Sequence, residues 1–167
     1  MIINLIIEVF DSTYTERDKE IKTVFLKNIY NPLISKIFIF YESSTTSFIK
    51  FIQSQQKLFN FLQNKIILIK HHCRLTFKHV FEYIKLNIPP NQYCILSNND
   101  IYFDTSIQHL AKINFNNTLV TLLRYNIENY NGQFSLYCEN IAPCIYSQDT
   151  WIVKTPLNII PPDINFH

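Results

Sequence analysis

Glycine is nearly absent from this chain, since Gly132 is the only one among 167 residues. A P-loop and the G-x-G-x-x-G fingerprint of dinucleotide-binding domains both need several glycines, whose bare backbone approaches phosphate closely. The sequence therefore excludes both motifs. Any nucleotide that binds here must be held by side chains and a metal ion in place of a glycine-rich loop.

A strong net charge, a targeting segment and paired cysteines are also missing. The formal charge of +2 leaves no broad basic surface for nucleic acid, so we expect no nucleic-acid partner. Residues 1–10 are apolar but lack a basic start and contain Asn4 and Glu8, which excludes a signal peptide and a membrane span. The cysteines show no C-x-x-C spacing, and we expect reduced thiols and a cytoplasmic protein. Cys94 is expected to be a buried small hydrophobe, and a Cys138–Cys144 bridge is less favoured.

Apolar segments of two kinds alternate along the chain, and 47% hydrophobic content is enough for the core of one domain. Strands are predicted at 2–9, 36–41, 65–69, 93–96 and 118–123, and helices at 16–30, 46–62 and 75–86. Residues 128–140 are expected to form a loop or a β-excursion, and a further short element starts within 147–151. This alternation predicts a single α/β domain over 1–167, with a mostly parallel central sheet and helices on both faces.

Polar side chains follow the fourth predicted strand at its carboxyl end, where open α/β sheets bind ligands. Asn98, Asn99 and Asp100 stand there in sequence. Carboxylate and amide oxygens are the ligands that Mn²⁺ or Mg²⁺ prefers, and such a cation suits a diphosphate. We therefore expect Asp100 and Asn98 to hold a divalent cation. The alternative is a simple Asx-rich turn, with Asp104 capping a helix over 105–113.

Three arginines lie near the predicted ends of strands or starts of helices. Arg74 follows the third strand, Arg124 follows the fifth, and Arg17 lies in the first turn of the first helix. A guanidinium can bind phosphate or a sugar hydroxyl through two bonds. A solvated surface role is the alternative for Arg74 and Arg124 and the default for Arg17. A cation at a helix start opposes the helix dipole, which slightly favours function for Arg74.

Asp149 and a histidine pair are the remaining candidates for chemistry. Asp149 lies beside Trp151, and an apolar wall raises the pKa of a carboxylate and suits a general base. The alternative is a capping aspartate under a packed tryptophan. His71 and His72 are adjacent on an extended segment and point to opposite faces, so they cannot readily share one ion. We expect both to be surface histidines.

Residues 97–104, Ser-Asn-Asn-Asp-Ile-Tyr-Phe-Asp, resemble the N-x-D-I-Y-F-D segment of small GT-A-type nucleotide-sugar glycosyltransferase domains. These domains occur in large DNA viruses, among them the chlorovirus capsid-glycosylating enzymes, and in bacteria. The segments at 74–77, 122–125 and 147–152 agree with the family in order and spacing, so the resemblance covers most of residues 2–160. Family members continue past residue 167 into a Gly-Cys-Asp-containing segment, which implies a C-terminally truncated domain here.

The resemblance implies a GT-A fold, an NDP-sugar donor that is often UDP-linked, and Mn²⁺ or Mg²⁺ at a D-x-D-like element. Asp100 fills the last position of that element, and Asn98 stands in place of its first aspartate. The residues implied to contact the donor are Phe10, Arg17, Glu42, Arg74, Asn99 and Arg124. Asp149 is implied to be the catalytic base beside a glycan or glycoprotein acceptor. A viral member would act in the host cytoplasm.

We therefore predict a metal-dependent, hexosyltransferase-like enzyme that moves a sugar from an NDP-sugar to an acceptor hydroxyl. A catalytically weak or inactive nucleotide-sugar-binding module of the same fold is the alternative, favoured by the missing charge at Asn98. A hydrolase with Asp100 and Asp149 as paired carboxylates is less favoured, because two-metal hydrolases usually show more carboxylates or histidines. An α/β domain with only an interaction role also stays open.

Overall fold

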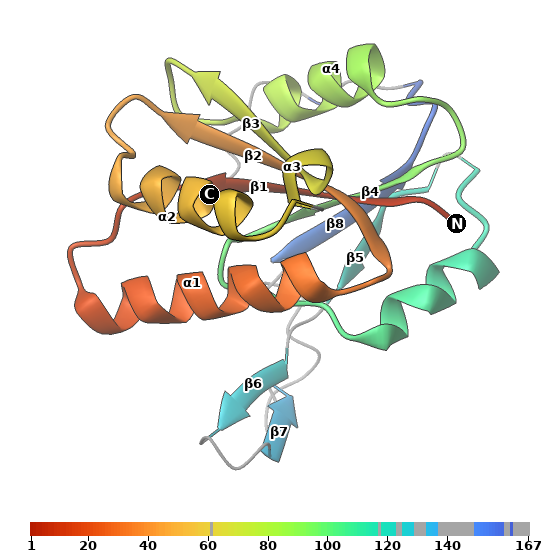
Figure 1. Cartoon of the computed structure of the whole chain (residues 1–167). Helices are drawn as coiled ribbons and strands as arrows, with labels where there is room; N and C mark the ends of the chain where they lie inside the picture. The colour runs from red at the N-terminus through yellow and green to blue at the C-terminus, as the bar shows by residue number, and fades with distance from the viewer. Residues whose placement is uncertain are drawn as a thin grey trace.

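A six-stranded sheet in the order β3-β2-β1-β4-β8-β5 forms the centre of the protein (Figure 1). The computed structural model describes residues 1–60, 62–116, 118–122, 125–128, 133–136, 149–158 and 161, with the backbone alone at 58, 125–128 and 133–136. The strands are β1 Ile3–Val9, β2 Ile34–Glu42, β3 Ile66–His71, β4 Tyr93–Ser97, β5 Val120–Leu122, β6 Tyr125–Glu128, β7 Gln133–Leu136 and β8 Thr150–Lys154. The helices are α1 Thr15–Tyr30, α2 Ser47–Leu58, α3 Leu62–Lys65, α4 Phe77–Asn87 and the 3₁₀ helix η1 Thr105–Lys112.

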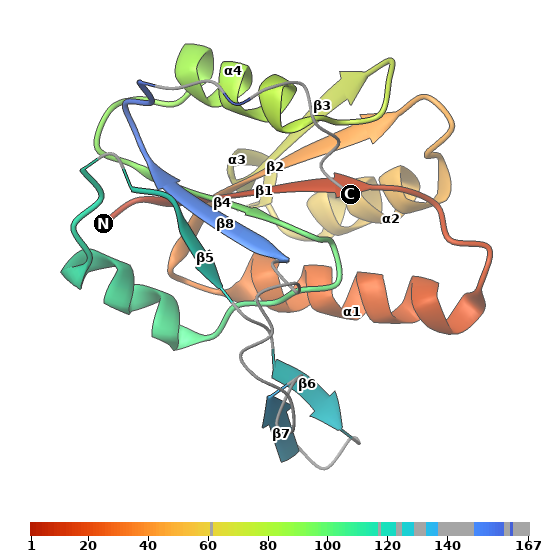
Figure 2. The same ribbon diagram turned by 180° about the vertical axis from the view of Figure 1, so that it is seen from behind.

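The first four strands of this sheet are parallel, as predicted. β1 lies between β2 and β4 and is buried along its whole length, which explains its mainly apolar sequence, rich in β-branched residues. The later strand β8 inserts antiparallel between β4 and β5, as the view from behind shows (Figure 2). The predicted α/β architecture, with a mostly parallel central sheet and helices on both faces, is confirmed, and it is Rossmann-like.

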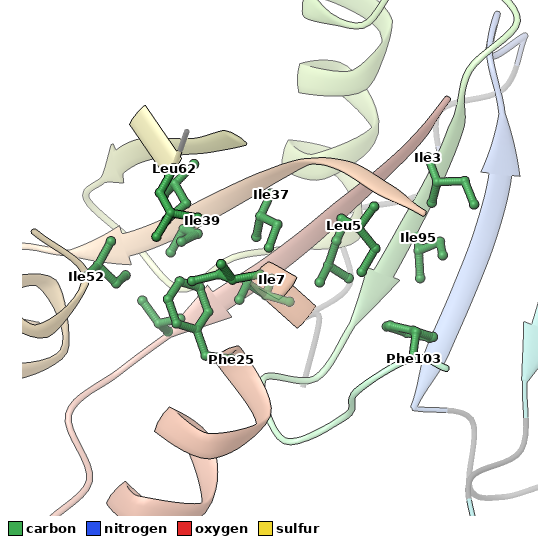
Figure 3. Close-up of a cluster of buried hydrophobic side chains, with 14 of the residues drawn as sticks. Ile3, Leu5, Ile7, Phe25, Ile37, Ile39, Ile52, Leu62, Ile95 and Phe103 are labelled. Carbon is green, nitrogen blue, oxygen red and sulfur yellow. The ribbon is translucent and has the colours of Figure 1, made fainter. Parts of the chain in front are cut away.

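Alternating side chains of the strands divide the core into two layers, because successive strand residues point to opposite faces. On one face Leu5 and Ile7 pack in a cluster with Phe25 of α1 and Ile52 of α2 (Figure 3). Residues of η1 belong to the same cluster. On the other face Ile6 and Leu96 pack against α4, with Val80 and Ile84 fully buried. Helices therefore cover both faces and leave the ends of the strands open.

Two predicted helices differ from those observed. The predicted helix over 46–62 is interrupted: α2 ends at Leu58, and the one-turn helix α3 begins only at Leu62. The predicted strand over 65–69 begins at Ile66. Residues 105–113 form a 3₁₀ helix, and Asp104 caps it by accepting a hydrogen bond from the backbone of Ser106 at 2.8 Å. The capping role considered for Asp104 is therefore confirmed.

The later part of the chain contributes β-structure. β7 lies inside the predicted excursion at 128–140 and pairs with β6 in a separate two-stranded sheet. The short element expected within 147–151 is β8, which begins at Thr150. Cys94 is buried, as expected, whereas Cys138 and Cys144 lie outside the described residues. No helix in the described part of the chain is long and apolar enough to cross a membrane.

Candidate functional site

A cleft of about 500 Å³ opens at the carboxyl ends of the parallel strands. β1 is followed along the chain by a crossover to β2 on one side, whereas β4 joins β1 on the other side. This reversal of strand order is where open α/β sheets place ligands. The residues that line the cleft are Glu8, Val9, Phe10, Arg17, Glu42, Ser44, Thr45, Arg74, Asn98, Asn99 and Asp100.

Asp100 forms an ion pair with Arg17 across this cleft. The Arg17 Nη2 lies 2.7 Å from Asp100 Oδ2, and its Nη1 lies 2.8 Å from Glu20 Oε2 on the next turn of α1. Burial alone lowers the pKa of the guanidinium, but the hydrogen bonds to Asp100 and Glu20 outweigh it and raise that pKa above its ordinary value. Arg17 therefore stays charged and neutralises one oxygen of Asp100.

The loop that carries Asp100 is held against α1 by two buried asparagines. Asn28 donates to the carbonyl of Ile101 at 2.8 Å and accepts from the backbone N–H of Phe103 at 3.0 Å. Asn31 donates to the carbonyl of Phe103 at 2.8 Å. Because Asn28 and Arg17 belong to the same helix, this clamp sets the distance between Arg17 and Asp100.

Asn98 connects the cleft to Asp149, which immediately precedes β8. The Asn98 side chain donates to Asp149 Oδ1 at 3.1 Å, and its backbone N–H donates to the Asp149 carbonyl at 3.2 Å. Ser97 also donates to that carbonyl at 3.3 Å. These bonds follow from the β4–β8 pairing, in which Ser97 faces Thr150. Asp149 is thereby fixed next to the predicted metal residue Asn98, just outside the cleft lining.

The inner wall of the cleft holds a buried carboxylate, Glu8, that the sequence analysis had not selected. Glu8 Oε1 accepts from the backbone N–H of Leu75 at 3.2 Å and lies 3.3 Å from His71 Nε2. Burial raises the pKa of the Glu8 carboxyl, although the Leu75 bond and the His71 charge oppose this shift. Nearby Glu42 adds to the rise, whereas Arg74 reduces it.

The expectation of a surface histidine is wrong for His71, whose side chain is 13% exposed, and correct for the exposed His72. The sequence feature that could have indicated this contact is Glu8 itself, a charged residue inside the apolar run of β1, because a buried charge requires a partner. His71 ends β3, two strands away, and its position opposite Glu42 in the β2–β3 pairing brings it to the same edge.

The loop after β1 is fixed by Asp11, which caps α2 from a distant part of the sequence. Its carboxylate accepts hydrogen bonds from the backbones of Thr46, Ser47 and Phe48 at 2.8 to 2.9 Å. Burial raises the pKa of Asp11, but the bonds to these N–H groups together lower it below its ordinary value. Thr45 in turn donates to the carbonyl of Val9 at 3.3 Å, which closes the β1 and β2 ends around the cleft.

Most residues predicted for the site come together in this one cleft. Phe10, Arg17, Glu42, Arg74, Asn98, Asn99 and Asp100 all line it, and Asp149 contacts Asn98. Arg124 lies outside the described residues. Their roles toward a donor or metal stay predictions. Glu8, Ser44 and Thr45 are lining residues that the sequence analysis missed.

The unsatisfied polar atoms of the cleft indicate what it could bind. Asn98 Oδ1 and Asp100 Oδ1 are buried acceptors with no hydrogen-bond partner in the described part of the chain, and Asn99 Nδ2 is a donor in the same situation. Buried polar atoms are normally paired, so three unpaired ones at one cleft indicate a place for a bound ligand. No group of three His, Cys, Asp or Glu suited to a metal is found among the described residues. The two oxygens nevertheless fit Mn²⁺ or Mg²⁺ if the cation takes its other ligands from phosphate and water, as these ions commonly do.

Comparison with known proteins was informative only at the level of structure. No family model and no curated protein matches the sequence. A crystal structure of 4-diphosphocytidyl-2C-methyl-D-erythritol synthase superposes with a TM-score of 0.52 at 11% identity, covering 92% of this chain and 74% of that one. The synthase of Anaerococcus prevotii DSM 20548 superposes with a TM-score of 0.51 at 12% identity, covering 91% of this chain and 69% of that one.

This chain shares their fold. At such low identity the similarity says nothing further about its chemistry, because one α/β fold supports many reactions. The cleft at the carboxyl ends of β1, β2 and β4, with its two arginines and two unpaired oxygens, is therefore the basis for any assignment of function.

Proposed function

We propose that this protein is a metal-dependent transferase that binds an NDP-sugar, in the first instance UDP-linked, and moves the sugar to an acceptor hydroxyl. The observation that carries the proposal is that two arginines and two buried oxygens without hydrogen-bond partners among the described residues line the same cleft. Arg17 and Arg74 supply positive charge for a diphosphate, and Asn98 Oδ1 and Asp100 Oδ1 supply ligands for a divalent cation.

The other cleft residues are compatible with a nucleotide. Phe10 is 46% exposed at the cleft although it is a large apolar side chain, so it offers a ring on which a base can stack. Ser44 and Thr45 line the same cleft, as does Glu42, whose carboxylate can accept bonds from ribose hydroxyls. A bound Mn²⁺ or Mg²⁺ would supply positive charge for the departing diphosphate.

Asp149 is the proposed base. In an inverting reaction a carboxylate takes the proton of the acceptor hydroxyl while the hydroxyl oxygen attacks the sugar C1, and the C1–O bond to the diphosphate breaks. Asp149 is held by Asn98 at the border of the cleft, so an acceptor that reaches the sugar would pass close to it. A retaining reaction would give Asp149 a different role.

The proposal is tested by thermal denaturation with UDP and Mn²⁺ added separately and together. We expect the combination to raise the melting temperature more than the sum of the two, and Asp100→Asn to remove the part that depends on Mn²⁺. Asp104→Asn is the matched control, because Asp104 lies in the same loop but caps η1 and does not line the cleft. Equal shifts in the wild type and Asp100→Asn would contradict the metal site.

One alternative has specific support. A binding module without turnover is favoured by the Arg17–Asp100 ion pair, which already neutralises the single cleft carboxylate of the metal site. Incubation with UDP-sugars and an acceptor panel, followed by measurement of UDP, separates the binding module from the transferase.

A further inference from the structure

We propose that Arg17 competes with the divalent cation for Asp100 and thereby couples binding of the cation to binding of the diphosphate. This inference rests on the proposed function and adds a role for a residue of the chain itself. In the described structure the guanidinium is bonded to the carboxylate that a cation would need. A cation and Arg17 cannot both use Asp100 Oδ2 at short distance, because two positive groups would then share one negative oxygen.

The geometry of Asp100 shows that one ligand site is available and one is taken. Oδ2 lies 2.7 Å from Arg17 Nη2, whereas Oδ1 is buried and has no partner among the described residues. The Asp100 side chain is 14% exposed, so the ion pair is shielded from water more than an ordinary surface pair. A cation that binds Oδ1 alone meets a carboxylate whose charge Arg17 has already neutralised. Strong binding of the cation therefore requires Arg17 to move.

Arg17 is able to move because its side chain is only partly buried. Its side chain is 39% exposed and lies in the first turn of α1, where it also contacts Glu20 at 2.8 Å. A diphosphate in the cleft offers the guanidinium more negative charge than one carboxylate, and phosphate suits its two-bond geometry. When Arg17 turns to the diphosphate, Asp100 becomes free for the cation. Each ligand then makes binding of the other easier, and this coupling must be reciprocal.

The competition makes a quantitative prediction for Arg17→Gln. Mn²⁺ alone should bind the variant about five- to tenfold more tightly than the wild type, the range of a partly shielded charged hydrogen bond. At saturating UDP the difference should disappear, because in the wild type the diphosphate has already drawn Arg17 away. The enhancement of Mn²⁺ affinity by UDP should therefore be smaller in Arg17→Gln by the same factor.

The experiment measures free Mn²⁺ by electron paramagnetic resonance, with and without UDP, in the full chain. Lys19→Gln is the matched control, because it removes the same charge from the same helix turn and its pair with Glu16 is largely exposed and away from the cleft. It should leave Mn²⁺ affinity within about twofold of the wild type, because exposed charges are screened by salt. Gln is also nearly as good a helix former as Arg, so the variant should fold.

The possible outcomes separate this inference from the proposed function. If Mn²⁺ and UDP bind the wild type and Asp100→Asn loses Mn²⁺, but Arg17→Gln binds Mn²⁺ no more tightly than Lys19→Gln, the competition is refuted and the proposed site stands. If the wild type and both variants bind neither Mn²⁺ nor UDP, the proposed function itself fails. The coupling is supported if Arg17→Gln binds Mn²⁺ more tightly than the wild type without UDP, and if both proteins bind Mn²⁺ equally well at saturating UDP.

Discussion

Asn28→Ala tests how the chain holds the loop that carries Asp100. Asn28 is 2% exposed on α1, and its amide makes two bonds to this loop, one to the Ile101 carbonyl and one from the Phe103 N–H. Each neutral bond contributes a net of about 0.5–1.5 kcal/mol, and a buried group left without a partner costs about 1–3 kcal/mol. We expect Asn28→Ala to lower the free energy of unfolding by about 2–4 kcal/mol, a large share of the roughly 5–15 kcal/mol typical of a domain.

The assay is urea denaturation followed by the fluorescence of Trp151, the only tryptophan of the chain. The matched control is Asn87→Ala, since Asn87 is exposed at the end of α4 and makes one local bond to the carbonyl of Tyr83 at 2.9 Å. Its loss should change stability by less than about 0.5 kcal/mol. A similarly small effect of Asn28→Ala would refute the idea that this amide fixes the loop.

Asn28→Asp gives a sharper test of the same clamp. The carboxylate can still accept from Phe103, but it cannot donate to Ile101 until it is protonated. Burial opposite a carbonyl raises the pKa of such a carboxyl in the folded state, so the variant is most stable at low pH and loses stability as the pH rises. Its deficit against the wild type should therefore be smaller at about pH 4 than at about pH 7. A deficit that does not change with pH would contradict the donor role of Asn28.

Two further predictions concern the buried and capping carboxylates, and urea denaturation at several pH values measures both. Asp11→Ala should cost about 1 kcal/mol at neutral pH through loss of the α2 cap. Because the pKa of Asp11 is lowered in the folded state, its contribution to stability is complete above the ordinary pKa of 3.8 and disappears as the pH falls through the lower folded value. A stability difference between Asp11→Ala and the wild type that stayed constant down to strongly acidic pH would refute this. Glu8 has a raised folded pKa, so the wild type loses stability as the pH rises from its ordinary value of 4.5 through the folded value. Glu8→Gln keeps an acceptor for Leu75 and should gain stability relative to the wild type over this range, whereas a gain confined to lower pH would show that the shift has the opposite sign.

The sequence was sufficient for the fold because its strongest pattern is local. The apolar run of β1 and the helical spacing of Ile21, Phe25 and Ile29 each identify an element without knowledge of the rest of the chain. Because parallel strands have their carboxyl ends at one edge of the sheet, Asn98, Asn99 and Asp100 are expected at the same edge as Arg17 and Arg74, and all five residues line one cleft. These inferences need only the chain order and the handedness of crossovers.

The missed features depend on contacts between distant residues. No local pattern pairs Glu8 with His71, because 63 positions separate them and the parallel register alone brings them to 3.3 Å. The Arg17–Asp100 ion pair is similar, since its members are 83 positions apart. The insertion of β8 beside β4 also could not be predicted from its composition, because β-propensity does not specify a neighbour.

The position of β8 has a consequence for how the protein matures on the ribosome. β8 is the last strand along the described chain, yet it occupies an inner place in the sheet, and Asp149, the residue just before it, supplies the carbonyl that holds Asn98. While residues 150–154 are still being synthesised, β4 remains an edge strand whose N–H and C=O groups can pair with other nascent chains. Assembly of the cleft edge therefore waits until β8 has been synthesised, and the growing polypeptide is exposed to aggregation until then.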